Sequence, residues 1–399
     1  MKTLPLSVLF SCLAFPYCVT AQEWKNECIG YYQLQLPDNL EVALYPVEDF
    51  VNPKKQPESD GDIKTRLYAS PGITFDKTYY KQKRGVVQAQ FTELKYGKYE
   101  LGISSESPEL IGFSAYKERA KDNIIFWNNV RKQYEALNFR MFKESIMPEA
   151  EFNQRYGYLI KDYPDAFTIY ESRGYTIYIN KERRLYHFWG DYQKNTGDKS
   201  QTAEKQLHDS EPEVLSLLNR FRPRKLYEVP TEQGFCLPYG FIAGDSGHEK
   251  RNMGVTYRLK DHPDVSIFFQ DLGPNPGPGE QRPYERRPDE KMSAKDYVTY
   301  FWNRRYGHSF REIKLYGKGF SSPKIDHRDG AAAFAKFTRR SKEVDFGYMA
   351  YVKGNAENTE PGLLFYVIRD SRQAKDQLPM DKDELEKIAE HIVSSIKRR

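Results

Sequence analysis

Long apolar runs and an excess of one charge sign are both missing from this sequence of 399 residues. After the first two dozen residues, no apolar stretch approaches the roughly 20 residues that a transmembrane helix needs, so the sequence predicts no membrane span in the mature chain. Lys and Arg number 61 against 56 Asp and Glu, and the resulting net charge of +5 is dispersed. A charge so small and so interleaved argues against a nucleic-acid partner.

Catalytic signatures are also scarce. The sequence has no Gly-x-Ser-x-Gly elbow, phosphate-binding loop, dinucleotide fingerprint or His-Glu-x-x-His motif. Gly244-Asp245-Ser246-Gly247 is similar to the nucleophile loop of chymotrypsin-like proteases, but the upstream His187 and His208 lack the context of a general base. A serine without a base is inert, and these residue types are those of an ordinary turn. We therefore expect no catalytic, cofactor-binding or metal-binding residues. The 56 acidic residues are too many for the sequence to support or exclude a pair of catalytic carboxylates.

Aromatic residues, by contrast, are abundant. They make up 15% of the chain, with 30 Tyr and 24 Phe. So much ring surface indicates a folded chain, because disordered chains contain few aromatic residues. The length suggests two domains, or one large one.

The first 21 residues have the features of an export signal. Lys2 supplies the positive charge, Leu4 to Phe15 is mostly apolar, and Val19-Thr20-Ala21 provides short residues at the cleavage positions. We expect cleavage before Gln22 and a periplasmic location. Because the run is short and is interrupted by Pro5 and ended by Pro16, a membrane anchor is the less favoured interpretation.

Cleavage would leave only two of the four cysteines, Cys28 and Cys236. Two thiols in an oxidising compartment often pair, so a disulfide between them is one expectation. The alternative is two separate free cysteines, each buried as a small apolar side chain.

Periodicity predicts an α+β fold. In the first half, short β-branched and aromatic segments at 166–170, 175–179 and 184–189 read as a meander of strands. Ile124, Trp127, Val130, Tyr134 and Leu137 have helical spacing. Ser210-Glu211-Pro212-Glu213 resembles a capping box that would begin a second helix.

The second half repeats this plan. Strands are expected around 235–243, 255–259 and 265–269, then a helix after Ser293, strands at 346–352 and 363–369, and a last helix capped by Asp381. Each half has a cysteine in its first strand and a Phe-Trp-Asn triplet in its middle helix, at residues 126–128 and 301–303. We therefore predict two similar mixed domains, 22–225 and 226–399, each with a mainly antiparallel sheet and packed helices.

A long Pro- and Gly-rich loop, 273–288, is the oddest segment of the chain. Long irregular loops are often functional, and Tyr and Arg are enriched in interface hot spots. Tyr284, Arg286 and Arg287 are therefore candidate partner contacts, unless the loop is merely a solvated linker.

Two segments carry a family resemblance. Glu27-Cys28-Ile29-Gly30-Tyr31-Tyr32, continuing to Leu36-Pro37, resembles the start of the N-terminal domain of the type VI secretion lipase immunity proteins. Residues 234–242, Gly-Phe-Cys-Leu-Pro-Tyr-Gly-Phe-Ile, resemble the start of that family's C-terminal domain. One departure is Tyr31, because the family's usual form has an Arg after Cys-x-Gly.

The resemblance implies a two-domain periplasmic antidote that is not an enzyme and has no cofactor. Its partner would be a cognate phospholipase effector, which it would inhibit by blocking substrate entry or lid opening. Two alternatives remain open at this point: a periplasmic hydrolase whose site forms only in three dimensions, and a protein that binds an envelope ligand.

Overall fold

The structure is a computed structural model that describes residues 23–45, 47, 93–107, 112–190, 201–273, 292–303, 310–355, 360–374 and 376–399. The predicted signal segment 1–21 and its cleavage before Gln22 lie outside these residues. So do Tyr284, Arg286 and Arg287 of the Pro- and Gly-rich loop.

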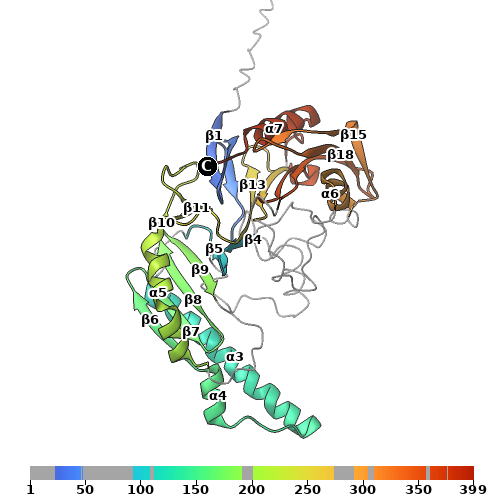
Figure 1. Cartoon of the computed structure of the whole chain (residues 1–399). Coiled ribbons are helices and arrows are strands. Elements are labelled where there is room, and N and C mark those ends of the chain that lie inside the picture. The colour runs from blue at the N-terminus through green and yellow to red at the C-terminus, as the bar shows by residue number, and fades with distance from the viewer. Residues whose placement is uncertain are drawn as a thin grey trace, which may run out of the picture.

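The first half of the chain contains short strands, then helices, then a meander of strands and a further helix (Figure 1). Its elements are β1 (Trp24–Ile29), β2 (Tyr32–Pro37), β3 (Leu40–Val42), β4 (Glu93–Tyr96), β5 (Tyr99–Ile103), α3 (Phe113–Phe142), α4 (Glu149–Tyr156), β6 (Tyr158–Tyr163), β7 (Ala166–Glu171), β8 (Gly174–Lys181), β9 (Arg184–Gly190), α5 (Ala203–Arg220) and β10 (Phe221–Pro223).

The second half has the same kinds of element in a matching order. They are β11 (Gly234–Leu237), β12 (Gly240–Ala243), β13 (Arg251–Leu259), β14 (Val265–Asp271), α6 (Ala294–Phe301), β15 (Glu312–Ser321), β16 (Lys324–Ile325), β17 (Arg328–Asp329), β18 (Ala331–Thr338), β19 (Val344–Val352), β20 (Leu363–Arg369), the 3-10 turn η5 (Ser371–Gln373), α7 (Lys382–Ser395) and β21 (Lys397–Arg398).

The two halves share one strand topology. The first half orders its strands β4-β5-β9-β8-β7-β6, with α3 and α4 between β5 and β6. The second orders them β13-β14-β20-β19-β18-β15, with α6 between β14 and β15. All pairings between named strands in the described residues are antiparallel. The predicted α+β class is confirmed, and so is the repetition of elements.

The halves do not keep separate sheets. β4 pairs with β13 from Tyr96 opposite Arg251 to Glu93 opposite Gly254, and β3 pairs farther along β13. Because β4 and β13 hold equivalent places in the two halves, the sheets join edge to edge through matching strands. This join gives one continuous 13-stranded sheet.

Helices cover the two faces of this sheet differently. On one face α5 and α7 pack over a single apolar core that runs through both halves and includes Val214, Leu217, Leu385 and Ile392. On the other face α6 covers a second core in the C-terminal half, whereas α3 covers only a small cluster in the N-terminal half. The last helix therefore packs on the core, with Asp381 accepting a hydrogen bond from the Asp383 amide as its cap.

A second set of contacts fastens the halves together, and we call it the joint. It consists of the hairpins β1–β2 and β11–β12 and the tails β10 and β21. Each tail adds a strand to the other half's hairpin: β10 pairs with β12, and β21 pairs with β2. The exchange is reciprocal, because the Arg224 amide donates to the Tyr239 carbonyl and the Arg399 amide donates to the Tyr31 carbonyl.

The capping box expected at Ser210 is wrong. Helix α5 begins at Ala203, and Thr202 caps it by accepting a hydrogen bond from the Lys205 amide at 3.2 Å. Ser210 is buried inside the helix, where its hydroxyl donates to the Gln206 carbonyl. Pro212 lies in the same helix. Because Thr202 already supplies a cap and the residues after it are helical, the helix begins before Ser210.

Candidate interaction surface

Helix α3 carries a line of apolar side chains along one face, and we call these residues the apolar stripe. They are Trp127, Val130, Tyr134, Leu137 and Met141, spaced alternately by three and four residues. That spacing keeps all five on one side of a helix. At about 1.5 Å per residue, the 14 residue steps from Trp127 to Met141 span about 21 Å.

The beginning of α3 is anchored on the sheet. Tyr116 is buried, and its ring lies 5.8 Å from that of Phe167 and 5.6 Å from that of Tyr178. Its hydroxyl meets Nε2 of His187 on β9. Burial lowers the pKa of His187 to about 3, so this imidazole is neutral near pH 7.

The rest of α3 runs past the strands, away from the C-terminal half (Figure 1). Here the stripe is open to solvent: Trp127 is 46% exposed, Tyr134 63%, Leu137 46% and Met141 62%. The nearby side chains of Phe126, Phe139, Phe142 and Ile146 are also exposed. So many exposed apolar side chains on one segment mark an interaction site more often than a solvated face.

Helix α4 braces this projecting part of α3. The Asn128 side-chain amide donates to the Tyr156 carbonyl at 3.0 Å, and the Arg131 guanidinium lies 4.8 Å from the centre of the Tyr156 ring. The Lys132 ammonium lies 4.8 Å from the centre of the Phe152 ring. Asn128 and Lys132 lie on the side of α3 away from the stripe and Arg131 borders it, so α4 supports the helix while Trp127, Tyr134, Leu137 and Met141 stay exposed.

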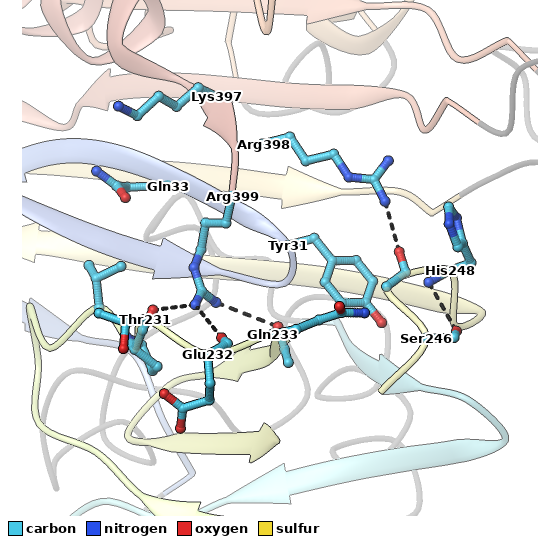
Figure 2. A pocket seen from close by; sticks show the side chains of 14 residues that line it. Tyr31, Gln33, Thr231, Glu232, Gln233, Ser246, His248, Lys397, Arg398 and Arg399 are labelled. Atoms are coloured by element: carbon cyan, nitrogen blue, oxygen red, sulfur yellow. Dashed lines mark hydrogen bonds between the residues drawn. The ribbon is translucent and has the colours of Figure 1, made fainter. Parts of the chain in front are cut away.

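A hollow of about 740 Å³ lies in the joint, beside the C-terminal residues (Figure 2). Its lining includes Gln33, Ser246, His248 and the tripeptide Lys397–Arg399. The Arg399 guanidinium donates to the carbonyls of Pro230, Glu232 and Gly234, and the Arg398 guanidinium donates to the Gly247 carbonyl. Burial first, and then the nearby Arg224, lower the pKa of Arg399. Two of the three cationic groups are thus used within the joint.

A buried ion pair and a disulfide connect the two halves in the joint. Arg224 lies 2.5 Å from Glu27 and donates to the Cys28 and Leu237 carbonyls. A second buried pair, Arg251 with Asp271 at 2.5 Å, lies within the second half, and the Arg251 guanidinium is 4.6 Å from the centre of the Tyr31 ring of the first half. Cys28 and Cys236 form a disulfide with a Cα–Cα separation of 5.8 Å, across 208 residues of sequence. The hollow therefore lies beside the contacts that hold the two halves together.

The protease-like tetrapeptide forms a turn. The Gly247 amide donates to the Asp245 carboxylate at 3.0 Å, and that carboxylate also accepts from the Tyr31 hydroxyl at 2.6 Å. The Ser246 hydroxyl donates to the Glu249 carboxylate at 3.0 Å, so its hydrogen bond goes to an acid and not to an imidazole. Within the described residues, no group of three His, Cys, Asp or Glu side chains could hold a metal ion.

Of the residues singled out in the sequence, the structure brings together Cys28 and Cys236, while Tyr284, Arg286 and Arg287 lie outside the described residues. The apolar stripe was visible in the sequence as a helical period, but nothing in that period distinguishes a buried face from an exposed one. Among the described helices, none is long and apolar enough to cross a membrane.

Comparisons with known proteins give one consistent picture. Residues 228–300 match the family model described as the Tle cognate immunity protein 4 C-terminal domain. No curated protein matches the sequence.

Among solved structures, the immunity protein TplEi of the Pseudomonas aeruginosa type VI secretion system, complexed with an "L" peptide, is 14% identical. It matches over 94% of this chain and 98% of that chain with a TM-score of 0.50. The Tle4–Tli4 complex contributes a chain that is 16% identical, over 94% of this chain and 97% of that chain, again with a TM-score of 0.50. At this identity the likeness concerns the fold.

Residues 228–300 are therefore similar in sequence to an immunity-protein C-terminal domain, and the whole chain shares its fold with TplEi and with a chain of the Tle4–Tli4 complex, in line with the resemblance of the segments around Cys28 and Cys236.

Proposed function

We propose that this protein is an immunity protein that binds a cognate type VI secretion phospholipase effector and blocks its activity without catalysing a reaction itself. The observation that carries the proposal is the family match at residues 228–300, together with a fold shared from end to end with an immunity protein. The Tle4–Tli4 complex is a precedent for an immunity protein bound to its effector.

The architecture is suited to binding another protein. The joint holds two similar halves in a fixed relation through a disulfide, a buried ion pair and exchanged tails. A rigid scaffold loses little conformational entropy on association, which favours tight binding. The exposed apolar surface of α3 provides area to bury, and a stable complex needs roughly 800 Å² on each partner.

The proposed location is the periplasm. A disulfide that closes more than 200 residues of chain is typical of an oxidising compartment, and the segment 1–21 has the pattern of an export signal cleaved before Gln22. We propose that the mature chain has two domains, 22–225 and 226–399, and that it meets the effector after a neighbouring cell delivers it.

One experiment tests this function. The mature chain would be co-expressed with the lipase encoded beside its gene, the complex purified, and phospholipase turnover measured against increasing amounts of the chain. We expect a stable complex and loss of turnover at equimolar ratio. Undiminished lipase turnover at a tenfold excess would refute the proposal, and hydrolysis of an ester or glycoside by the chain alone would favour an enzyme.

A further inference from the structure

We propose that the apolar stripe of α3 is the part of this protein that enters the effector, and that it docks in an apolar groove whose rims carry carboxylates. This inference rests on the proposed function and adds to it the contact surface and the chemistry of the surface that receives it.

The first argument is the cost of leaving the stripe in water. Trp127, Tyr134, Leu137 and Met141 are each about half exposed or more, on a helix whose first turns are well anchored by Tyr116. Burying such side chains on a partner stabilises the complex roughly in proportion to the apolar area that is removed from water. Folding of the described residues does not use this surface, so its stabilising effect remains available for binding.

The second argument is geometry. A strict alternation of three- and four-residue steps over two heptads presents one narrow line of anchors. A groove that accepts a single helix binds a line of apolar side chains of this kind. The stripe projects beyond the sheet (Figure 1), so a partner could reach it without displacing the strands.

The third argument is charge. The positions that border the stripe are Arg131 and Asn138 on one side, and Phe126, Gln133 and Arg140 on the other. None of them is acidic. The complementary surface therefore carries acids on its rims, which would also speed and orient the encounter.

The same charges decide against a second copy of this chain. Whichever way two α3 helices were paired through their stripes, the bordering positions would offer arginines and neutral residues, with no carboxylate to pair them. A lipid-processing enzyme, by contrast, must have an apolar surface to receive acyl chains, and it can border that surface with acids.

The test uses the full mature chain and the purified cognate lipase. Trp127→Ser/Leu137→Ser removes two anchors, and Arg140→Glu reverses one bordering charge. Leu378→Ser and Arg340→Glu are the matched controls, because Leu378 is 87% exposed and Arg340 is exposed, both far from α3 in sequence. Thermal unfolding of each variant checks that it still folds.

We expect the dissociation constant to rise at least about 30-fold for the double variant, the loss typical of one hot-spot side chain. For Arg140→Glu we expect about a tenfold rise that shrinks in high salt, and for the two controls no more than about a twofold change.

Other outcomes would overturn the inference. If the wild-type chain inhibits the lipase and the stripe variants inhibit equally well, the proposed function stands and the stripe is not its contact surface. If the wild-type chain fails to bind the lipase, both proposals fall. Loss of dimers in light scattering, or loss of binding to phosphatidylglycerol vesicles, with inhibition unchanged, would reassign the stripe to a second copy or to a membrane.

Discussion

The middle helices of the two halves carry the same three residues in opposite surroundings. At the C-terminal end of α6, directly after Phe301, Trp302 is 1% exposed and its ring meets that of Phe337 edge-on at 5.0 Å. In α3, Trp127 is 46% exposed, and its ring lies 5.4 Å from that of Phe126 in the same helix. Both helices follow the second strand of their half's sheet.

The difference teaches that an apolar helix face and a buried helix face are separate properties. In the C-terminal half α6 is eight residues long and lies over a full core. In the N-terminal half α3 is 30 residues long, and only its first turns meet a small cluster. The apolar residues beyond that cluster contribute little to folding, so their use lies elsewhere, and binding a partner is the use that we propose.

Removing the disulfide has the largest expected effect, and it tests whether the halves can be compared as parts of one rigid body. The chain-entropy model gives roughly 5 kcal/mol for a closed loop of this length, as an upper figure. We expect Cys28→Ala/Cys236→Ala to lower the free energy of urea unfolding by up to that amount. Equal stability with and without the disulfide would mean that the exchanged tails hold the joint alone.

The two arginines that end the halves provide the next comparison. Arg224 is buried against Glu27, whereas Arg399 is partly exposed and bonds mainly to carbonyls. Removing one partner of a buried ion pair costs about 3–5 kcal/mol, and losing hydrogen bonds at a partly exposed site costs about 1 kcal/mol. We expect Arg224→Met to destabilise the protein far more than Arg399→Met in chemical denaturation. Equal losses would contradict the asymmetry of the joint.

The two tryptophans sharpen the comparison directly. Trp302→Ala should cost about 3–5 kcal/mol, because it leaves a cavity in a closed core. Trp127→Ala should cost less than about 1 kcal/mol, because solvent already reaches the ring. Differential scanning calorimetry of both variants measures this contrast, and a large loss for Trp127→Ala would show that the stripe is needed for folding.

The effect that is smallest near neutral pH, and that grows as the pH falls, concerns the anchor of α3. The pKa of His187 is about 3 in the folded protein, well below its ordinary value of 6.5. The unfolded chain therefore binds a proton more readily between these two values, and this group's stabilisation decreases as pH falls from 6.5 toward 3. We expect His187→Gln to show a flatter dependence of unfolding free energy on pH in that window. An NMR titration of His187 with a midpoint near 6.5 would contradict the buried anchor.

Local structure could be predicted from the sequence where neighbouring residues alone determine it. The three strands expected at 166–170, 175–179 and 184–189 are β7, β8 and β9, and Asp381 caps the last helix as expected. The start of α5 was misplaced because a Ser-Glu-Pro-Glu pattern inside a helix looks like a helix start. The Ser-Glu-Pro-Glu pattern is compatible with a helix start, but the cap at Thr202 determines where α5 begins.

Contacts between distant segments could not be predicted in the same way. The pairing of β4 with β13, and the exchange of β10 and β21 between hairpins, leave no periodic trace in either partner. The helical period of the stripe could be recognised in the sequence, but the exposure of the stripe depends on where the sheet ends. The end of the sheet is determined by tertiary structure, which the repeated Phe-Trp-Asn triplet does not predict.

Hydrogen exchange on the complex with the cognate lipase tests the account most directly. Backbone amides of residues 125–142 should exchange quickly in the free protein, because that part of α3 is exposed, and should become strongly protected when the lipase binds. Amides of the joint should stay equally protected in both states. Protection gained elsewhere, with residues 125–142 unchanged, would contradict the claim that this protein acts through the exposed face of α3.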